Sequence, residues 1–448
     1  MSRTLRRHPL PWREPWDLAL ALAATSGWQG MVLLEGDGSR LGQRAVLGIE
    51  PLETVRCAGL PGMPAATDPF AALADLERRG GPWLGWLAYE AGAWVEPADH
   101  WQPSDMATLW AARHDPLIHF DRAGQRCWLE GEDPHRLAAM ANRLEGLTVA
   151  NPASGALPSA SPQPAAMPMA PIPLEAWHWH TPAEHYAAQV EQLRALIASG
   201  DLFQANLTAC CETLLAEPAN PLALYGRLRR HCPAPFAGLA IAGEEAVVSA
   251  SPERFLRCEP GGRVESRPIK GTRPRHRDAE ADADAAADLV CDPKDRAENV
   301  MIVDLLRNDL GRVCLPGSIQ VPQLVGLESY AQVHHLTSVV TGQLAPGHGV
   351  TDLLRACWPG GSISGAPKLR AIRRLAALEP VPRGPYCGSL FHLDAEGGFD
   401  SSILIRSVIV KGRRLRIQAG GGIVADSDPS GEAAEMGWKI KPLLEALA

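Results

Sequence analysis

Two apolar runs near the end of the chain constrain the fold most, because only four residues separate them. The first run covers residues 403–410 and the second covers residues 415–418. A connection this short joins antiparallel strands, since a parallel pair needs a crossover of a dozen or more residues. Further strand-like runs at residues 30–35, 83–89 and 246–249 do not alternate regularly with helices. The sequence therefore predicts an α+β fold based on antiparallel sheet rather than a doubly wound fold.

A Pro/Ala/Ser-rich stretch without periodicity divides the chain at residues 150–173. Such a composition is typical of an exposed and extended linker. The linker separates an N-terminal region, residues 1–149, from a C-terminal region, residues 174–448. Apolar spacing and start and stop signals predict helices at residues 185–199, 295–310 and 432–447.

The composition describes an ordinary globular protein and narrows its partners. With 448 residues, 46% of them hydrophobic, the chain is long enough for two or three domains or one large interlocked one. Its formal net charge of -8 argues against a nucleic-acid partner, because binding phosphates requires a basic surface. The ten cysteines contain no C-x-x-C pair, so neither a zinc site nor a redox dithiol is predicted. Reduced cysteines in the cytosol are the simplest interpretation.

The start of the chain is basic and is followed by a short apolar run at residues 18–24, as in a secretory signal. Pro11, Glu14 and Asp17 interrupt this pattern. No apolar stretch approaches the ~20 residues that a membrane-spanning helix needs. We therefore predict an amphipathic helix here, in a cytoplasmic protein without a membrane partner.

Two predicted helix starts each carry a pair of acids three residues apart. Asp295 and Glu298 form one pair; Glu432 and Glu435 form the other, with Lys439 four residues later. Residues at this spacing share one face of a helix. Acids are also favoured in the first turn of any helix, which is the purely structural interpretation. If the two pairs meet, they would suit Mg²⁺, which prefers carboxylates completed by water and substrate oxygens.

Glycine-rich loops and single basic residues offer sites for an anion. The loops at residues 358–368 and 418–422 allow backbone N–H groups to turn toward an anion, although the order of a nucleotide-binding loop is absent. Arg406, expected on a strand, would either clamp a carboxylate or face solvent. Without further context, Lys270 in RPIKGT and Glu253 in SPERF would be surface charges.

Taken in order, ten motifs resemble those of the chorismate-utilising enzymes. They are GDLFQANL, SPERF, RPIKGT, DRAENVMIVDLLRNDLGR, SYAQVHHLTS, GGSISGAPK, GPYCGSL, ILIRS, QAGGGIVADSDP and the terminal E-x-x-E-x-x-x-K. The resemblance runs from about Pro182 to the end of the chain. Residues 1–149 resemble the N-terminal region of the family through VLLEGDG and GWLAYEAG. The resemblance implies large antiparallel β-sheets packed as a sandwich, with helices on the outside.

Two positions indicate a branch of the family. Gln204 stands where isochorismate and salicylate synthases carry a water-activating lysine. Lys270 stands in the P-I-x-G-T motif, where anthranilate synthases carry alanine and aminodeoxychorismate synthases carry lysine. The resemblance therefore implies amination of chorismate at C4, through a covalent Lys270 adduct at C2, for p-aminobenzoate and folate biosynthesis. Anthranilate synthase component I, and a non-catalytic subunit that binds chorismate or an amino acid, are the alternatives.

The resemblance also implies roles for individual residues. Glu253 would be the general acid that helps the C4 hydroxyl depart. His335 would act near the reacting face, or else be a packed core histidine. Mg²⁺ would be bound by Glu298 and Glu435, with Asp295 and Glu432 supporting through water. The substrate would be bound by Arg406, Tyr386, Lys439, Gly420, Gly421, Gly422, Thr272, Ser362 and Gln204.

In this family a glutaminase subunit supplies the ammonia, and its G-x-C-x-G-x-Q motif is absent from the chain. We therefore expect a glutaminase partner in trans, activity with free ammonia, and no glutaminase activity of the chain alone. The N-terminal region resembles one that binds tryptophan, which makes tryptophan a further candidate partner. The motif here reads Leu33-Leu34-Glu35-Gly36, and the missing serine argues against feedback inhibition.

Overall fold

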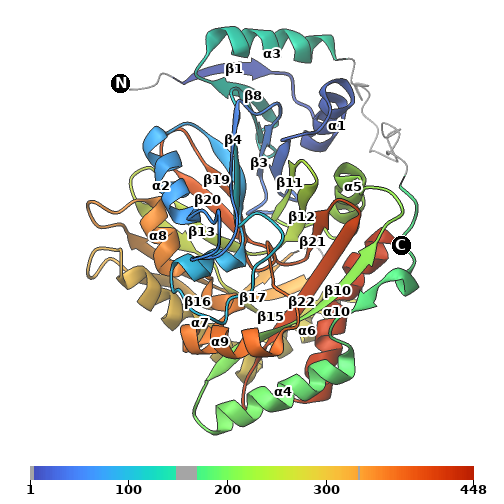
Figure 1. Cartoon of the computed structure of the whole chain (residues 1–448), viewed down its shortest axis with the longest axis vertical. Helices are drawn as coiled ribbons and strands as arrows, with labels where there is room; N and C mark the ends of the chain where they lie inside the picture. The colour runs from blue at the N-terminus through green and yellow to red at the C-terminus, as the bar shows by residue number, and fades with distance from the viewer. Residues whose placement is uncertain (1–4, 148–168, 331–332) are drawn as a thin grey trace.

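Two large β-sheets form the centre of the molecule and helices lie outside them (Figure 1). The structure is a computed structural model that describes residues 5–147, 169–330 and 333–448. The first sheet has 12 strands, in the order β1 (Arg6–Leu10), β8 (Arg126–Gly131), β7 (Leu117–Asp121), β3 (Arg44–Gly48), β2 (Val32–Glu35), β11 (Phe236–Ala242), β12 (Glu245–Ser251), β21 (Ser407–Lys411), β22 (Arg414–Ile423), β10 (Gln204–Leu214) and β18 (Gly365–Ala366), with β9 (His178–Trp179) beside β10.

The second sheet has 10 strands. Their order is β15 (Ile269–Pro274), β17 (Val333–Gln343), β14 (Arg263–Ser266), β13 (Arg254–Cys258), β20 (Phe399–Ile403), β19 (Ser389–Leu393), β5 (Trp83–Leu87), β6 (Leu109–Arg113) and β4 (Glu53–Cys57), with β16 (Gln320–Ser329) beside β17. The pairings in both sheets are antiparallel, as in the hairpin of β21 and β22. The predicted α+β fold with large antiparallel sheets is therefore confirmed.

The three largest buried apolar clusters of the described residues hold the layers together. The cluster between the two sheets contains Trp86, Trp110, Val247 and Leu390. A second cluster lies between the first sheet and α1 (Pro15–Ser26), α3 (Pro134–Gly146), α4 (Ala183–Ala198), α5 (Pro221–His231) and α10 (Pro429–Leu447). A third lies between the second sheet and α2 (Pro69–Arg79), α7 (Pro293–Gly311) and α8 (Val350–Cys357). Helix α9 (Lys368–Leu378) contributes residues to both of these outer clusters. Helix α6 (Ala279–Cys291) packs on β15, β16 and β17.

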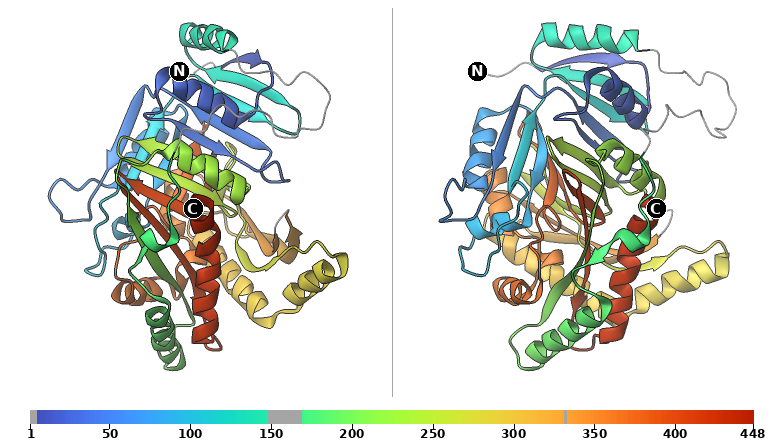
Figure 2. Two further views of the ribbon diagram at one scale, coloured as in Figure 1. Left: turned by 90° about the vertical axis from the view of Figure 1, so that its right-hand side faces the viewer. Right: turned by 45° about the vertical axis from the view of Figure 1, so that its right-hand side comes forward.

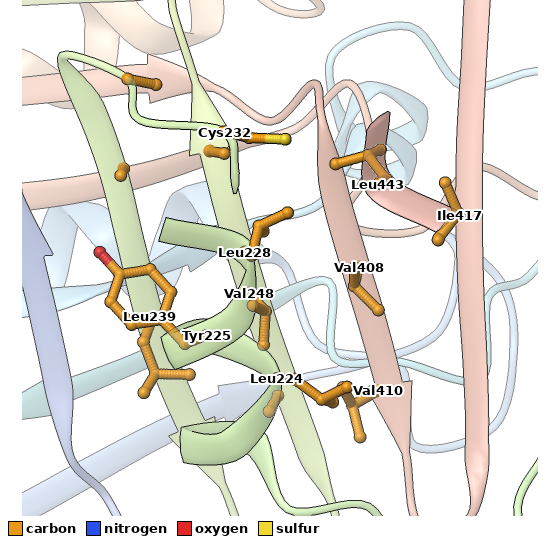
Figure 3. Packing of buried hydrophobic residues seen from close by; sticks show 14 of the residues in the cluster. Leu224, Tyr225, Leu228, Cys232, Leu239, Val248, Val408, Val410, Ile417 and Leu443 are labelled. Carbon is orange, nitrogen blue, oxygen red and sulfur yellow. The ribbon is translucent and has the colours of Figure 1, made fainter. Parts of the chain in front are cut away.

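Helix α5 shows how the outer clusters form. Leu224, Tyr225 and Leu228 lie on one face of this helix and point at β11, β12 and β21 (Figure 3). Leu443 of α10 lies near Val408 of β21 and Ile417 of β22 (Figure 3). Burying each such apolar side chain contributes roughly 1.5–3 kcal/mol, so the two helices are fixed firmly against the first sheet.

Strands from both sides of the predicted linker share both sheets. In the first sheet β2 pairs with β11, and in the second β5 pairs with β19. Figure 2 shows the blue N-terminal strands continuing the sheets of the green to red strands. The linker prediction falls largely on residues 148–168, which lie outside the described residues. The division at residues 149 and 174 stays a proposal.

Most predicted elements match the structure. The helices predicted at residues 185–199, 295–310 and 432–447 are α4, α7 and α10, and the N-terminal one is α1. None of the helices in the described part of the chain is both long and apolar enough to cross a bilayer.

The single strand predicted over residues 403–410 is wrong. The chain leaves β20 of the second sheet, crosses between the layers, and enters β21 of the first sheet. Arg406 therefore lies between the strands rather than on one, with a left-handed backbone (φ 50°). The apolar pattern does not reveal the crossing, because both sheets are buried on both faces at this point.

Candidate active site

Lys270 lies on β15 and is largely, though not fully, buried. Its side chain is 11% exposed, and its Nζ lies 3.6 Å from Oε2 of Glu298 on α7. The pairing of β15 with β17 shifts by one residue between Lys270 and Thr272, at Gly271. Gly271 has φ 78°, and a Cβ there would lie 2.8 Å from the Asp295 carboxyl carbon. This glycine bulge therefore lets α7 approach the strand and brings its acids to the lysine.

Glu253 lies between β12 and β13, near enough to Lys270 to feel its charge. It is 5% exposed and accepts hydrogen bonds from the Ser362 hydroxyl and the Ile269 backbone N–H. Burial raises the pKa of Glu253 to about 7, although the nearby Lys270 opposes the shift. A carboxyl group with this pKa is substantially protonated at neutral pH and can donate a proton.

The acids predicted on α7 are both at the site. Glu298 faces Lys270, and Asp295 accepts from Nη1 of Arg273 at 3.2 Å. Burial raises the pKa of Glu298, and the charges of Asp295 and Glu432 add to this effect. The second carboxylate pair, from α10, therefore lies close to the first.

The two acids of α10 are also held by lysines. Lys294 of α7 contacts Glu432 at 2.6 Å, and Lys439 contacts Glu435 at 2.8 Å. Burial alone would lower the pKa of Lys294, but its hydrogen bond to Glu432 and the other acids raise it. The start of α10 is fixed by its N-cap, where the Asp428 side chain accepts from the Gly431 N–H.

The two helix starts bring their four carboxylates within electrostatic reach of one another, and lysine and arginine side chains balance their charge. Within the described residues, no three His, Cys, Asp or Glu side chains are already grouped as a metal site. The donor set nevertheless consists of hard carboxylate oxygens beside a substrate site, which is the chemistry that Mg²⁺ requires. The residues therefore fit a magnesium ion that is completed by substrate and water.

Arg406 and His335 form a basic side of the site. The His335 Nδ1 and the Thr272 hydroxyl are 2.8 Å apart. Burial, together with the nearby Arg406 guanidinium, lowers the pKa of His335 to about 4, so its imidazole is neutral at neutral pH. Arg406 is half-buried, and its guanidinium has no ion-pair partner among the residues that the structure describes. An unpaired guanidinium of this kind is suited to binding a ligand carboxylate.

The residues Gly420, Gly421 and Gly422, here called the glycine edge, lie beyond the last residue of β22 that pairs with β21. They pair with β10 on one side only, which leaves backbone groups on the other side for a ligand. Lys439 donates to the Gly420 carbonyl at 2.9 Å. A Cβ on Gly422 would collide with Gln204 and lie 2.7 Å from Glu298 Oε2.

Gln204 and Tyr386 differ in their surroundings. Gln204 is fully buried, and neither atom of its amide has a hydrogen-bond partner among the described residues. Its place against Gly422 puts this free amide at the glycine edge. Tyr386 is 3% exposed within the third apolar cluster, where its hydroxyl meets the Cys387 thiol. The structure gives Tyr386 no contact with the other predicted site residues that it describes.

Lys294 and Arg273 hold site acids but were not predicted. Lys294 directly precedes Asp295 in the sequence, and Arg273 lies in the same stretch as Lys270. The acids at the two helix starts could have predicted them, because carboxylates that lie close together need cationic side chains nearby.

The N-terminal motif proposed for tryptophan borders a separate cavity of about 530 Å³ between the sheets. Its lining includes Leu34, Glu35 and Phe236. The Glu35 carboxylate is already held by Tyr225, Arg229 and Arg122.

Comparisons with known proteins show which family the chain resembles. Residues 42–445 match the model of the family described as chorismate binding enzyme. The chain is 43% identical over 272 residues to aminodeoxychorismate synthase component 1 of Salmonella typhimurium. The matched segment covers 61% of this chain and 59% of the relative. It is 39% identical over 371 residues to aminodeoxychorismate synthase of Streptomyces griseus, covering 82% of this chain and 50% of the relative. The chain therefore spans between half and three fifths of these relatives.

Other similar proteins carry a different name. Anthranilate synthase component 1 of Streptomyces coelicolor is 38% identical over 81% of this chain and 72% of its own length. The crystal structure of anthranilate synthase component I from Streptococcus pneumoniae superposes with a TM-score of 0.75 at 29% identity, covering 90% of this chain and 92% of that chain. The menaquinone-specific isochorismate synthase of Escherichia coli, at 18% identity and a TM-score of 0.74, shares the fold.

Proposed function

Because the chain belongs to the chorismate-binding enzyme family, we propose that this chorismate-utilising enzyme aminates its substrate at C4, as an aminodeoxychorismate synthase component I. The observation that carries the proposal is the largely buried Lys270, which lies 3.6 Å from Glu298 and interacts electrostatically with the proton donor Glu253. The names of the relatives at 43% and 39% identity support this assignment.

The proposed reaction has two allylic steps. The neutral amine of Lys270 forms a bond to C2 of chorismate, the double bond shifts, and the C4 hydroxyl leaves as water with the proton of Glu253. Ammonia then forms a bond at C4, the double bond shifts back, and the bond between C2 and Lys270 breaks. The C4 ammonium group formed from ammonia returns one proton to the Glu253 carboxylate. The products are 4-amino-4-deoxychorismate and water, and Lys270 and protonated Glu253 are regenerated. Covalent catalysis replaces one difficult substitution with two easier ones.

The other residues orient the substrate. Arg406 and the glycine edge would hold the carboxylates, and the neutral His335 would hydrogen-bond near the reacting face with Thr272 fixing its ring. Glu298 and Glu435 would bind Mg²⁺, with Asp295 and Glu432 in support. When bound, the ion neutralises and orients a substrate carboxylate.

Ammonia would come from a separate glutaminase subunit, and the name component 1 of the relative is consistent with a further component. We expect the lone chain to use free ammonia. Tryptophan remains a proposed ligand of the cavity beside Glu35, separate from the active site.

The test is to incubate the chain with chorismate, an ammonium salt and Mg²⁺ and to identify the product by mass and fluorescence. We expect 4-amino-4-deoxychorismate without pyruvate release. Fluorescent anthranilate with pyruvate would establish the second candidate, anthranilate synthase component I, which is favoured by the similarity to relatives of that name over most of the chain. No turnover with ammonia would indicate a non-catalytic binding subunit.

A further inference from the structure

A buried acid–base pair next to the proposed site joins several segments that carry site residues. Arg383 and Glu379 follow α9 and are 2% and 8% exposed. The Arg383 Nε donates to Glu379 Oε2 at 2.8 Å, and its Nη2 donates to Oε1 at 2.6 Å. The Tyr89 ring covers the guanidinium at 4.6 Å. A bidentate pair of this kind has a fixed geometry as well as strong hydrogen bonds.

The pair completes the edge of β10 where a strand is missing. The neighbouring strand β18 is two residues long and pairs only with the first two residues of β10. Further along β10, Arg383 Nη2 donates to the Asn206 carbonyl at 2.7 Å, and the Thr208 N–H donates to Glu379 Oε1 at 3.1 Å. Buried backbone groups must be paired, so the acid and the base take the place of the absent strand.

The same guanidinium reaches the turn that carries Ser362. Arg383 Nη1 donates to the Ile363 carbonyl at 2.7 Å. The hydroxyl of Ser362, the preceding residue, donates to Glu253. On its opposite edge β10 pairs with the glycine edge, and its first residue is Gln204. One side chain thus sets the separation between the strand behind the substrate carboxylates and the turn behind the proton donor.

We propose that Arg383 and Glu379 are positioning residues for chorismate turnover, which hold the glycine edge and the Ser362 turn at a fixed separation. The inference rests on the proposed function. Neither side chain touches a residue proposed to react, so both act through Ser362 and β10. Because a misplacement of about 1 Å can cost ~100-fold in rate, loosening the pair should lower kcat by roughly 10- to 100-fold and change KM far less.

The experiment compares Arg383→Lys with wild type by measuring the rate of chorismate consumption in the presence of ammonia and Mg²⁺. This rate can be measured whichever carbon of chorismate is aminated. Lysine keeps the charge but cannot bind Glu379, Ile363 and Asn206 at once. The pH at which activity falls through deprotonation of Glu253 should also rise by about one unit. The reason is that the ionised Glu253 would lose its hydrogen bond from Ser362, and a lost hydrogen bond to an ionised group changes a pKa by about this much. Lys270, the charged neighbour of Glu253, is unchanged in the variant.

The matched control is Arg136→Lys, which loosens the pair between Arg136 of α3 and the buried Asp115, away from the site. Its kcat and pH profile should equal those of wild type. If Arg383→Lys fails to fold, the double variant Glu379→Gln/Arg383→Met removes both charges together and decides instead, since replacing a whole buried pair is often tolerated.

A folded variant whose kcat and pH profile both match wild type would overturn the positioning role. A reduced kcat without a shift in the pH at which Glu253 deprotonates would also overturn it. A general loss of stability would lower kcat in the same way without changing that pH. A wild-type chain that consumes no chorismate would overturn the proposed function, a result that is distinct from either.

Discussion

The Nζ of Lys270 and Oε2 of Glu298 lie 3.6 Å apart, so the proposed nucleophile and a proposed magnesium ligand contact each other directly. The lysine charge and a metal ion therefore compete for the same carboxylate. Binding of Mg²⁺ at Glu298 would release Lys270 from its ion pair and free its amine for the substrate. This contact links the first and third predictions.

Replacing Lys270 should separate chemistry from binding. We expect Lys270→Met to lower the rate of C4 amination by ~10³-fold or more, as removal of an enzyme nucleophile does. The same variant should bind Mg²⁺ more tightly than wild type, because a competing cation is gone from Glu298. Product analysis and a magnesium titration monitored by thermal unfolding measure the two effects. Amination at the wild-type rate would show that Lys270 is not the nucleophile.

The pH dependence of turnover should follow Glu253. Burial raises the pKa of Glu253 to about 7, and the proposed role requires the protonated form. The activity should therefore fall as pH rises above about 7. Glu253→Gln cannot donate a proton, so its kcat should be ~10²–10⁴-fold lower than that of wild type below about pH 7, without the fall that wild type shows above it. A rate profile measured from pH 5 to 9 at a constant concentration of free ammonia checks both, and a wild-type rate that keeps rising to pH 9 under this condition would exclude Glu253 as the acid.

Removing the negative charge of the proposed magnesium ligands tests their role. Glu298→Gln and Glu435→Gln should each raise the concentration of Mg²⁺ needed for half-maximal activity by roughly 10- to 100-fold, the range seen when groups supporting a metal are removed. Glu191→Gln, on the exposed face of α4, is the control and should change nothing. Chelation with EDTA should abolish wild-type turnover. Full activity in EDTA would show that no divalent ion takes part.

The sequence predicted the parts of the site that are local. The acids of α7 and α10 were visible because their spacing is helical, within helices expected at residues 295–310 and 432–447. The antiparallel fold was visible from the β21–β22 hairpin. These features depend on residues within one or two turns of each other.

The features that escaped prediction depend on distant contacts. Lys294 meets Glu432 across 138 residues of sequence, and Arg383 meets Asn206 across 177. Arg406 was expected on a strand because the crossing between two buried sheets keeps an apolar pattern. Neither periodicity nor local spacing records which segments a fold brings together.

The stability of the protein should depend on pH through Glu90. This side chain is 2% exposed, its Oε1 accepts from the Gly384 N–H at 3.0 Å, and its Oε2 has no partner among the described residues. Burial raises the pKa of Glu90 to about 7 from 4.5. Between these values the folded chain keeps a proton that the unfolded chain loses. The contribution to stability is thus complete below about pH 4.5 and is lost as pH rises through about 7.

Glu90→Gln removes this titration and keeps an acceptor for the Gly384 N–H. Relative to wild type, the variant should gain up to ~3 kcal/mol in free energy of unfolding at pH 8 and nothing at pH 4.5, from ~1.4 kcal/mol per pKa unit. Urea unfolding at both pH values measures the difference. Glu253 also titrates near pH 7 in both proteins, so only the difference between variant and wild type is informative. An equal difference at both pH values would mean that Glu90 carries the same charge throughout, and that the free oxygen is satisfied by another group.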